Sequence, residues 1–128
     1  MLPDNRILVG GSFTNVNGVA RGYLVRLNAD GTTDTTFNPG GTGPGNAVNA
    51  IARQASDGKL YIGGSFTNYN GAAINRVARL NADGTLDTTF NPGTGAGSTV
   101  NAIALDTSVT PARVLIGGTF TSYNGETP

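Results

Sequence analysis

Three chemically versatile residue types are missing from this 128-residue sequence, which has no cysteine, no histidine and no tryptophan. Thiol and imidazole groups supply the commonest nucleophile, the commonest general base and the commonest transition-metal ligands of enzymes. Their absence disfavours catalysis. We therefore expect no enzyme, no cofactor and no metal site.

Charge and long apolar runs are also scarce. Charged side chains make up 12% of the chain, and the 8 basic and 8 acidic groups cancel. The arginines are spread along the sequence and form no basic stripe, so we expect no nucleic-acid partner. No apolar run approaches the ~20 residues that span a bilayer, so we expect no membrane insertion. No signal peptide is visible after Met1, and this absence says little about export.

Glycine is abundant instead, with 20 residues, and asparagine and threonine accompany it. This mixture suits short strands joined by tight turns and disfavours long helices. The same mixture recurs as an internal repeat of about 53 residues. Residues 7–52 align with residues 60–104 with one gap and match at 31 of 45 positions. A repeat of this length is typical of solenoids and propellers, because each unit is one supersecondary element.

Each repeat unit predicts four short strands. In the central unit they cover residues 48–53, 59–66, 76–81 and 85–90. Asp-Gly pairs at 57–58 and 83–84 predict tight hairpin turns, and residues 67–75 form a longer loop. Because apolar residues run consecutively in the second strand, both of its faces need burial, as in a blade packed between neighbours. The fold class is therefore all-β, with β-propeller-type blades of four antiparallel strands.

The strand pattern also predicts which residues form the core and why two glycines are paired. A Gly-Gly pair inside the second strand predicts a place where a neighbouring chain approaches too closely for a Cβ atom. A phosphate-binding glycine loop would need a following helix, and none is predicted. The residues expected to be buried are Leu60, Ile62, Phe66, Val77, Leu80 and Phe90, with their counterparts Ile7, Val9, Phe13, Leu24, Leu27 and Phe37.

The units resemble the delta-sixty repeat family, β-propeller repeats of large bacterial surface and secreted proteins. The residues that carry the resemblance are Leu80–Asn91 (LNADGTLDTTFN) and Asp57–Phe66 (DGKLYIGGSF). The units are more distantly similar to kelch repeats, whose second strand also has paired glycines, although the Tyr and Trp that follow them in kelch blades have no match. The resemblance implies a propeller and an extracellular or cell-surface location, with no reaction and no catalytic residue.

The repeat divides the chain into three parts. Residues 1–47 are a partial blade with the second to fourth strands, residues 48–99 a complete blade, and residues 100–128 a partial blade with the first two strands. A closed propeller has typically 4–8 blades. We expect either a segment of a longer protein, whose remaining blades complete the ring, or a homo-oligomer that closes it; the segment is favoured.

The long loops offer the candidate binding residues. The loops between second and third strands and between successive blades share one face, and they differ most between the copies. Solvent-facing loops also vary without any function, and that alternative is favoured. If a glycan or protein ligand binds, the candidates are Tyr69, Asn70, Asn75, Arg76, Arg21, Tyr123 and Asn124.

Two recurring polar sets have simpler explanations than a functional site. Asn28, Asp30 and Asp34, with their counterparts in the next unit, could offer oxygen ligands to calcium, but the spacing fits a calcium loop poorly. A hairpin turn in which Asp bonds its own backbone explains them better. Arg26 with Asp34 and Arg79 with Asp87 predict structural cross-strand ion pairs.

Two functions remain open. The first is a non-enzymatic scaffold or binding module for a glycan or protein in a surface or extracellular assembly. The second is a purely structural building block of a surface layer, filament or virion appendage. A glycan-array screen separates them.

Overall fold

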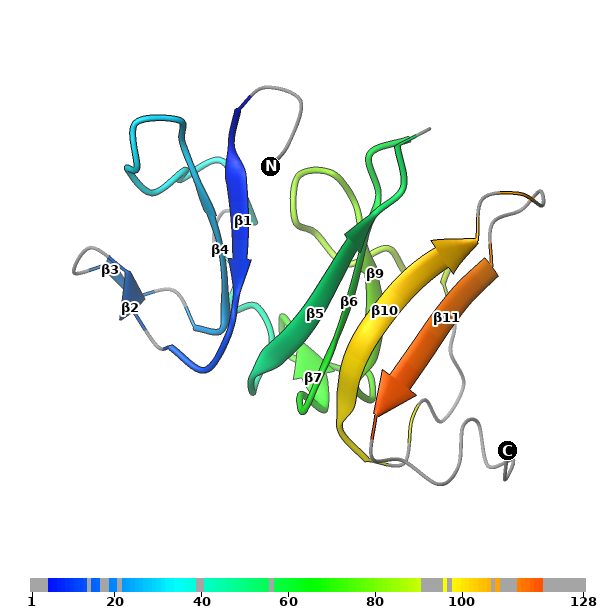
Figure 1. Ribbon diagram of the computed structural model, residues 1–128. Helices are drawn as coiled ribbons and strands as arrows, with labels where there is room; N and C mark the ends of the chain where they lie inside the picture. Colours follow the sequence, from blue (N-terminus) through cyan, green and yellow to red (C-terminus); the bar gives the residue numbers. More distant parts are fainter. Residues whose placement is uncertain are drawn as a thin grey trace.

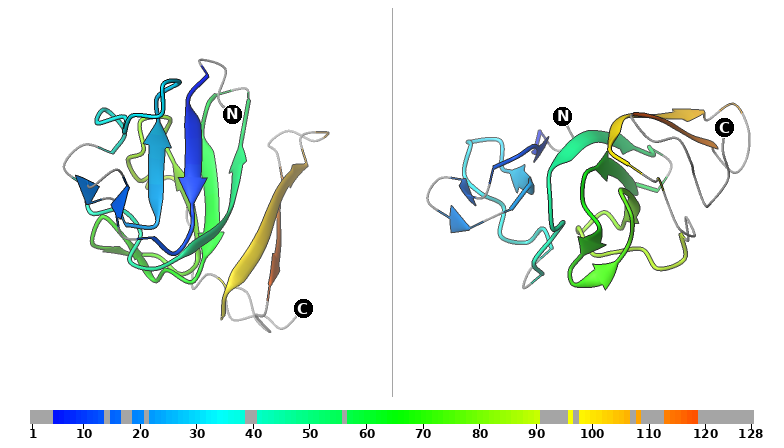
Figure 2. Two further views of the ribbon diagram at one scale, coloured as in Figure 1. Left: turned by 60° about the vertical axis from the view of Figure 1, so that its left-hand side comes forward. Right: turned by 90° about the horizontal axis from the view of Figure 1, so that it is seen from below.

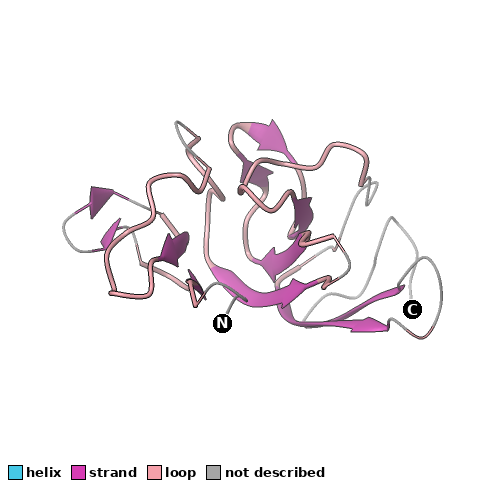
Figure 3. Cartoon of the chain, turned by 90° about the horizontal axis from the view of Figure 1, so that it is seen from above, coloured by secondary structure: helices cyan, strands magenta, loops and turns pink. Residues whose placement is uncertain are grey.

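The computed structural model describes residues 5–13, 15–16, 19–20, 22–38, 41–55, 57–90, 96, 98–106, 108 and 113–118. Over these residues the chain is all-β, with antiparallel sheets and no helix, as the sequence predicts (Figure 3). The main sheets of successive repeat units stand side by side along the molecule (Figure 1), and the described residues of the first two units add a separate two-stranded hairpin each. Two further views show the same stacking of the units from the side and from below (Figure 2).

Each unit forms one blade around its second strand. In the first blade β1 (Ile7–Gly10) pairs with β4 (Leu24–Leu27), and a small hairpin of β2 (Asn15–Val16) and β3 (Val19–Ala20) lies between them in the sequence. The second blade contains β5 (Val48–Arg53), β6 (Leu60–Gly64) and β9 (Val77–Leu80), with a side hairpin of β7 (Asn68–Tyr69) and β8 (Ala72–Ala73). The third contains β10 (Val100–Asp106) and β11 (Arg113–Gly118).

The predicted fourth strand is wrong in its extent. In the second blade it is reduced to one isolated bridge between Leu80 and Leu86, and in the first blade to a bridge between Leu27 and Thr33. The cause is the aspartate that follows. Asp87 Oδ1 accepts hydrogen bonds from the backbone N–H and the hydroxyl of Thr89, which turns the chain away from the sheet.

The side hairpin β7–β8 lies in a segment that the sequence pattern predicts as loop. Asn70 and Gly71 form its turn with φ of 51° and 83°. An Asn-Gly pair with both residues at positive φ is the preferred two-residue hairpin turn. The pair itself was therefore a signal for this element.

The expected core is largely confirmed. Leu60, Ile62, Phe66, Val77, Leu80, Leu24 and Phe37 are buried, while Val9, Phe13, Leu27 and Phe90 are partly buried. The prediction that Ile7 is buried is wrong, because 39% of its surface is exposed. Among the described residues β1 has a partner strand, β4, on one side only, so no first strand covers Ile7 in the way that β5 covers β6.

The paired glycines fulfil two separate steric requirements. A Cβ atom at Gly63 would lie 2.6 Å from Val100 Cγ1 in the next blade, so the predicted close approach of a neighbour is confirmed. A Cβ atom at Gly64 would instead overlap the carbonyl oxygen of Ala47, the residue that leads directly into β5, the partner strand of β6. The first glycine thus serves packing between blades, and the second serves packing within the blade.

Candidate functional site

The loops expected to share one face do meet. Gly43 and Gly45, in the connection between the first two blades, bond through their backbones to Asn70 and Asn68 in the side hairpin of the second blade. The side chains add a reciprocal amide pair, in which Asn38 Nδ2 donates to Asn70 Oδ1 at 3.0 Å and Asn70 Nδ2 donates to Asn38 Oδ1 at 2.8 Å. We call this pair the asparagine clasp. It fixes the loop face across the boundary between two blades.

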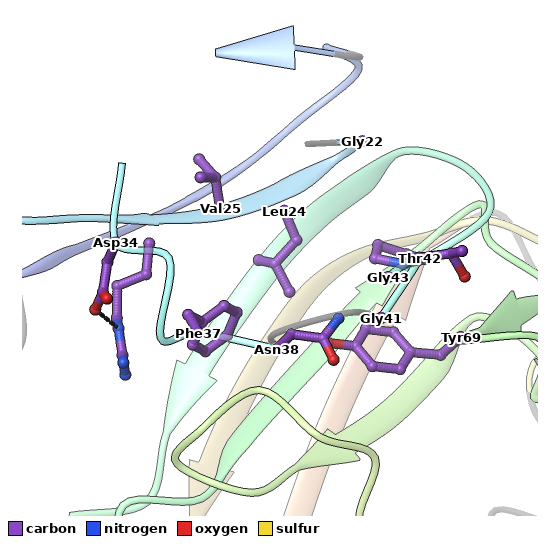
Figure 4. Close-up of a pocket in the computed structure, with 12 residues that line it drawn as sticks. Gly22, Leu24, Val25, Asp34, Phe37, Asn38, Gly41, Thr42, Gly43 and Tyr69 are labelled. Atoms are coloured by element: carbon purple, nitrogen blue, oxygen red, sulfur yellow. Dashed lines mark hydrogen bonds and ion pairs between the residues drawn. The ribbon is translucent and has the colours of Figure 1, made fainter. Parts of the chain in front are cut away.

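A cavity of about 300 Å³ lies beside the clasp (Figure 4). It runs along β4, with Leu24 and Phe37 on its apolar wall, and its polar side is formed by Asn38, Thr42 and the backbone of the 41–44 segment. The Arg26–Asp34 ion pair closes one end. Its size is at the small end of the range for small-molecule sites, and its mixture of apolar wall and a few polar groups is typical of them.

Tyr69 is part of the core and is not a surface contact. Its side chain is fully buried, and its hydroxyl donates a hydrogen bond of 2.5 Å to the Gly84 carbonyl. Burial raises the pKa of the phenol, with a smaller contribution from the nearby Asp83 carboxylate. Tyr69 lies at the side of the cavity, where the ring is part of the wall (Figure 4).

The other predicted ligand residues have structural roles where the structure describes them. Asn70 is exposed, but its side-chain amide is bonded to Asn38 in the asparagine clasp, and Asn75 is partly buried. Arg76 has a φ of 67° and donates from Nη1 to the Ala96 carbonyl at 3.1 Å. The remaining three candidates lie outside the described residues: Arg21, Tyr123 and Asn124.

The predicted arginine–aspartate pairs are confirmed, and each pair is part of a cluster in which the aspartate also contacts a second cation. Arg79 Nε lies 2.7 Å and Lys59 Nζ 2.9 Å from Asp87 Oδ2. The first blade repeats this with Arg26 Nε at 2.8 Å and Arg6 Nη1 at 3.0 Å from Asp34 Oδ2. The second cation was not predicted, although Arg6 and Lys59 occupy the same position of the repeat.

Both carboxylates of these clusters are held ionised. Burial opposes ionisation of Asp34, but hydrogen bonds from Thr36 and Arg26 outweigh it and lower the pKa to about 2. At Asp87 the hydrogen bonds from Thr89 and Lys59 are the main causes of a lowered pKa, against a smaller opposing effect of burial. The Arg26 guanidinium also lies 4.8 Å from the centre of the Phe37 ring. In the first and second blades, these clusters tie the third strand to the turn that follows it.

The turn aspartates bond to their own backbone, as the simpler explanation predicts. Asp30 Oδ1 accepts from the Thr32 N–H, and Asp83 Oδ1 accepts from the Thr85 N–H, both at 3.0 Å. Across the described part of the chain, no three His, Cys, Asp or Glu side chains gather as a metal site would require. The described residues also include no helix that is long and apolar enough to cross a membrane.

Comparison with known proteins identifies a family. A sequence model of a family described as a domain of unknown function (DUF5122) beta-propeller matches residues 2–37 and 55–90. The two matches cover corresponding parts of successive units and together more than half of the chain. No curated protein and no solved structure matches the chain significantly.

Proposed function

The chain belongs to the DUF5122 beta-propeller family, and on this basis we propose that it is a non-enzymatic scaffold or binding module of stacked blades. We further propose that the repeats are of the delta-sixty type, with kelch repeats as more distant relatives. We also propose that the protein is located at the cell surface or outside the cell. The low charge and the richness in asparagine and threonine suit contacts with a glycan or a protein.

The proposed binding of a ligand is supported by the cavity beside the asparagine clasp. It opens between two blades on the face where the variable loops gather, and loop residues form its polar side. The apolar wall of Leu24 and Phe37 suits the nonpolar face of a sugar ring. The amide of Asn38 and the hydroxyl of Thr42 suit its hydroxyl groups.

A glycan array screened with the chain tests this proposal. Thr42 is exposed at the cavity, so the substitution Thr42→Arg fills its opening without touching the buried core. We expect it to lower the affinity for any glycan bound there at least tenfold. The matched control is Thr35→Arg, which adds the same charge at an exposed residue outside the cavity lining and should leave binding unchanged. Equal effects of both variants would place the ligand elsewhere.

A purely structural building block is the second candidate. One observation favours this function: three predicted ligand residues, Tyr69, Asn70 and Arg76, already make hydrogen bonds within the chain. In that case the array gives no hit. Such a result would leave the stacking of blades, and not ligand binding, as the function of the loop face.

A further inference from the structure

The turn of the side hairpin β7–β8 contains a chemically reactive pair of residues. Asn70 and Gly71 are both exposed, and a Cβ atom at Gly71 would meet no neighbour within 4 Å, so solvent reaches this part of the backbone. Because glycine has no side chain to shield its backbone nitrogen, that nitrogen can attack the carboxamide of a preceding asparagine. The sequence contains three Asn-Gly pairs, at 17–18, 70–71 and 124–125, and the structure describes the second.

The reaction of such a pair is a loss of ammonia followed by hydrolysis. Here the Gly71 backbone nitrogen would form a bond to Asn70 Cγ and give up its proton to solvent, while Nδ2 would take up a proton and leave as ammonia. Water would then open the resulting succinimide ring at one of its two carbonyl groups. The product at position 70 is either aspartate or isoaspartate, in which the main chain runs through the former side chain.

The asparagine clasp holds the Asn70 carboxamide in place. Its Oδ1 accepts hydrogen bonds from the Gly43 N–H at 2.7 Å and from Asn38 Nδ2 at 3.0 Å. Its Nδ2, which would be the leaving group, donates to Asn38 Oδ1 at 2.8 Å. A Cβ atom at Gly41 would collide with the carboxamide oxygens of both asparagines, so the chain packs closely against the pair. These contacts have to break before the carboxamide can turn towards the Gly71 nitrogen.

We propose that Asn70 is a site of spontaneous deamidation and that the asparagine clasp sets the rate of this modification. The reaction needs no enzyme and no cofactor, because the attacking nitrogen and the leaving amide belong to neighbouring residues. Its rate is the rate in the open state multiplied by the fraction of time that the clasp is open. The proposal concerns the chemistry of the loop face and does not depend on the proposed glycan ligand.

The modification removes the reciprocity of the clasp. A carboxylate only accepts hydrogen bonds, so an aspartate at position 70 could accept from Asn38 Nδ2 and the Gly43 N–H, but its second oxygen would face Asn38 Oδ1. Isoaspartate would also lengthen the two-residue turn and strain the pairing of Tyr69 with Ala72. Because Asn38 and Tyr69 both line the cavity, either product would loosen the cavity wall (Figure 4).

Ageing of the native chain and of Asn38→Gly at mildly alkaline pH tests the proposal. Glycine accepts the φ of 50° that Asn38 has, so this variant removes the partner of Asn70 and keeps the backbone conformation. Peptide mapping by mass spectrometry measures deamidation at each Asn-Gly pair separately. We expect a roughly tenfold higher rate at Asn70, because two hydrogen bonds that close the clasp are lost. The rates at 17–18 and 124–125 should not change, and Thr35→Ala should change none of the three.

The structural consequence is measured with a variant that has the deamidated side chain from the start. Asn70→Asp should lower the thermal midpoint by roughly 3 °C, because one hydrogen bond of the clasp is lost and two oxygens face each other. Asn68→Asp is the matched control, since Asn68 is exposed in the same hairpin and takes no part in the clasp. It gains the same charge and should leave the midpoint unchanged.

An unchanged or lower rate at Asn70 in Asn38→Gly would overturn the proposal. Equal acceleration at all three Asn-Gly pairs would do so too, because unfolding of the whole chain, and not the clasp, would then set the rate. Equal midpoints of Asn70→Asp and Asn68→Asp would refute the structural consequence. None of these measurements involves a glycan, so their failure is distinguishable from a failure of glycan binding.

Discussion

At the scale of single residues, equivalent positions of the repeat make the same interactions in successive blades. Asp34 and Asp87 each form ion pairs with two cations and accept a hydrogen bond from a threonine. Each aspartate thereby ties the third strand of its blade to the following turn. The ion pair is predictable because the repeat places Arg and Asp on segments expected to pair, and one isolated bridge, Leu27–Thr33 or Leu80–Leu86, is enough to bring them together. The turn that the carboxylate induces is less visible in the sequence, since Thr also favours strands.

The lowered pKa of Asp34 predicts a loss of stability in acid. A carboxyl whose pKa falls from 3.8 to about 2 on folding stabilises the chain above the higher value and loses this contribution as the pH falls through the lower one. Between about pH 4 and pH 2, the contribution of Asp34 to the free energy of unfolding should fall by roughly 1–2 kcal/mol.

Urea unfolding of the native chain and of Asp34→Asn across this range measures the effect. The two unfolding free energies should differ most near neutral pH and converge towards pH 2, because the native carboxyl is then protonated. Thr35→Ala, at an exposed neighbour of the site, should keep the native pH dependence. A difference between the native chain and Asp34→Asn that stays constant with pH would contradict the assignment.

At the scale of secondary structure elements, the strands around each glycine pair could be predicted from the repeat. The apolar residues of the repeat, which run consecutively in its second strand, and the Asp-Gly turns predicted β5, β6 and β9 to within a few residues. The side hairpin could also have been predicted from Asn70-Gly71. The asparagine clasp could not, because Asn38 and Asn70 come together only when two blades stack.

The turn of this side hairpin depends on glycine at one position. Gly71 has a φ of 83°, and a Cβ atom there would meet no neighbour within 4 Å, so conformation alone disfavours other residues. Gly71→Ala should lower the free energy of unfolding by about 1–2 kcal/mol. Gly22→Ala is the matched control, because Gly22 also has open space but no positive φ, and it should have little effect. Equal losses in urea unfolding of the two variants would contradict this reading of the turn.

At the scale of the whole molecule, the blades are held together mainly by contacts between neighbours. β10 packs on β5 and β6 of the second blade, and β1 packs on β5 from the other side. The stability of such a stack is approximately the sum of terms for each unit and for each boundary. The ends should therefore open before the centre does.

Gly63→Ala tests this arrangement of independent boundaries. The added methyl group has no room beside Val100 and Ile103, while the pairing of β6 with β5 and β9 has no such conflict at this position. Hydrogen exchange should therefore show a loss of protection of at least tenfold in β10 and β11. The amides of β6 and β9 should change much less, because their partners lie within the second blade. If protection fell equally in all three blades, the chain would open as one cooperative unit, and the boundary at Gly63 would hold the whole stack together.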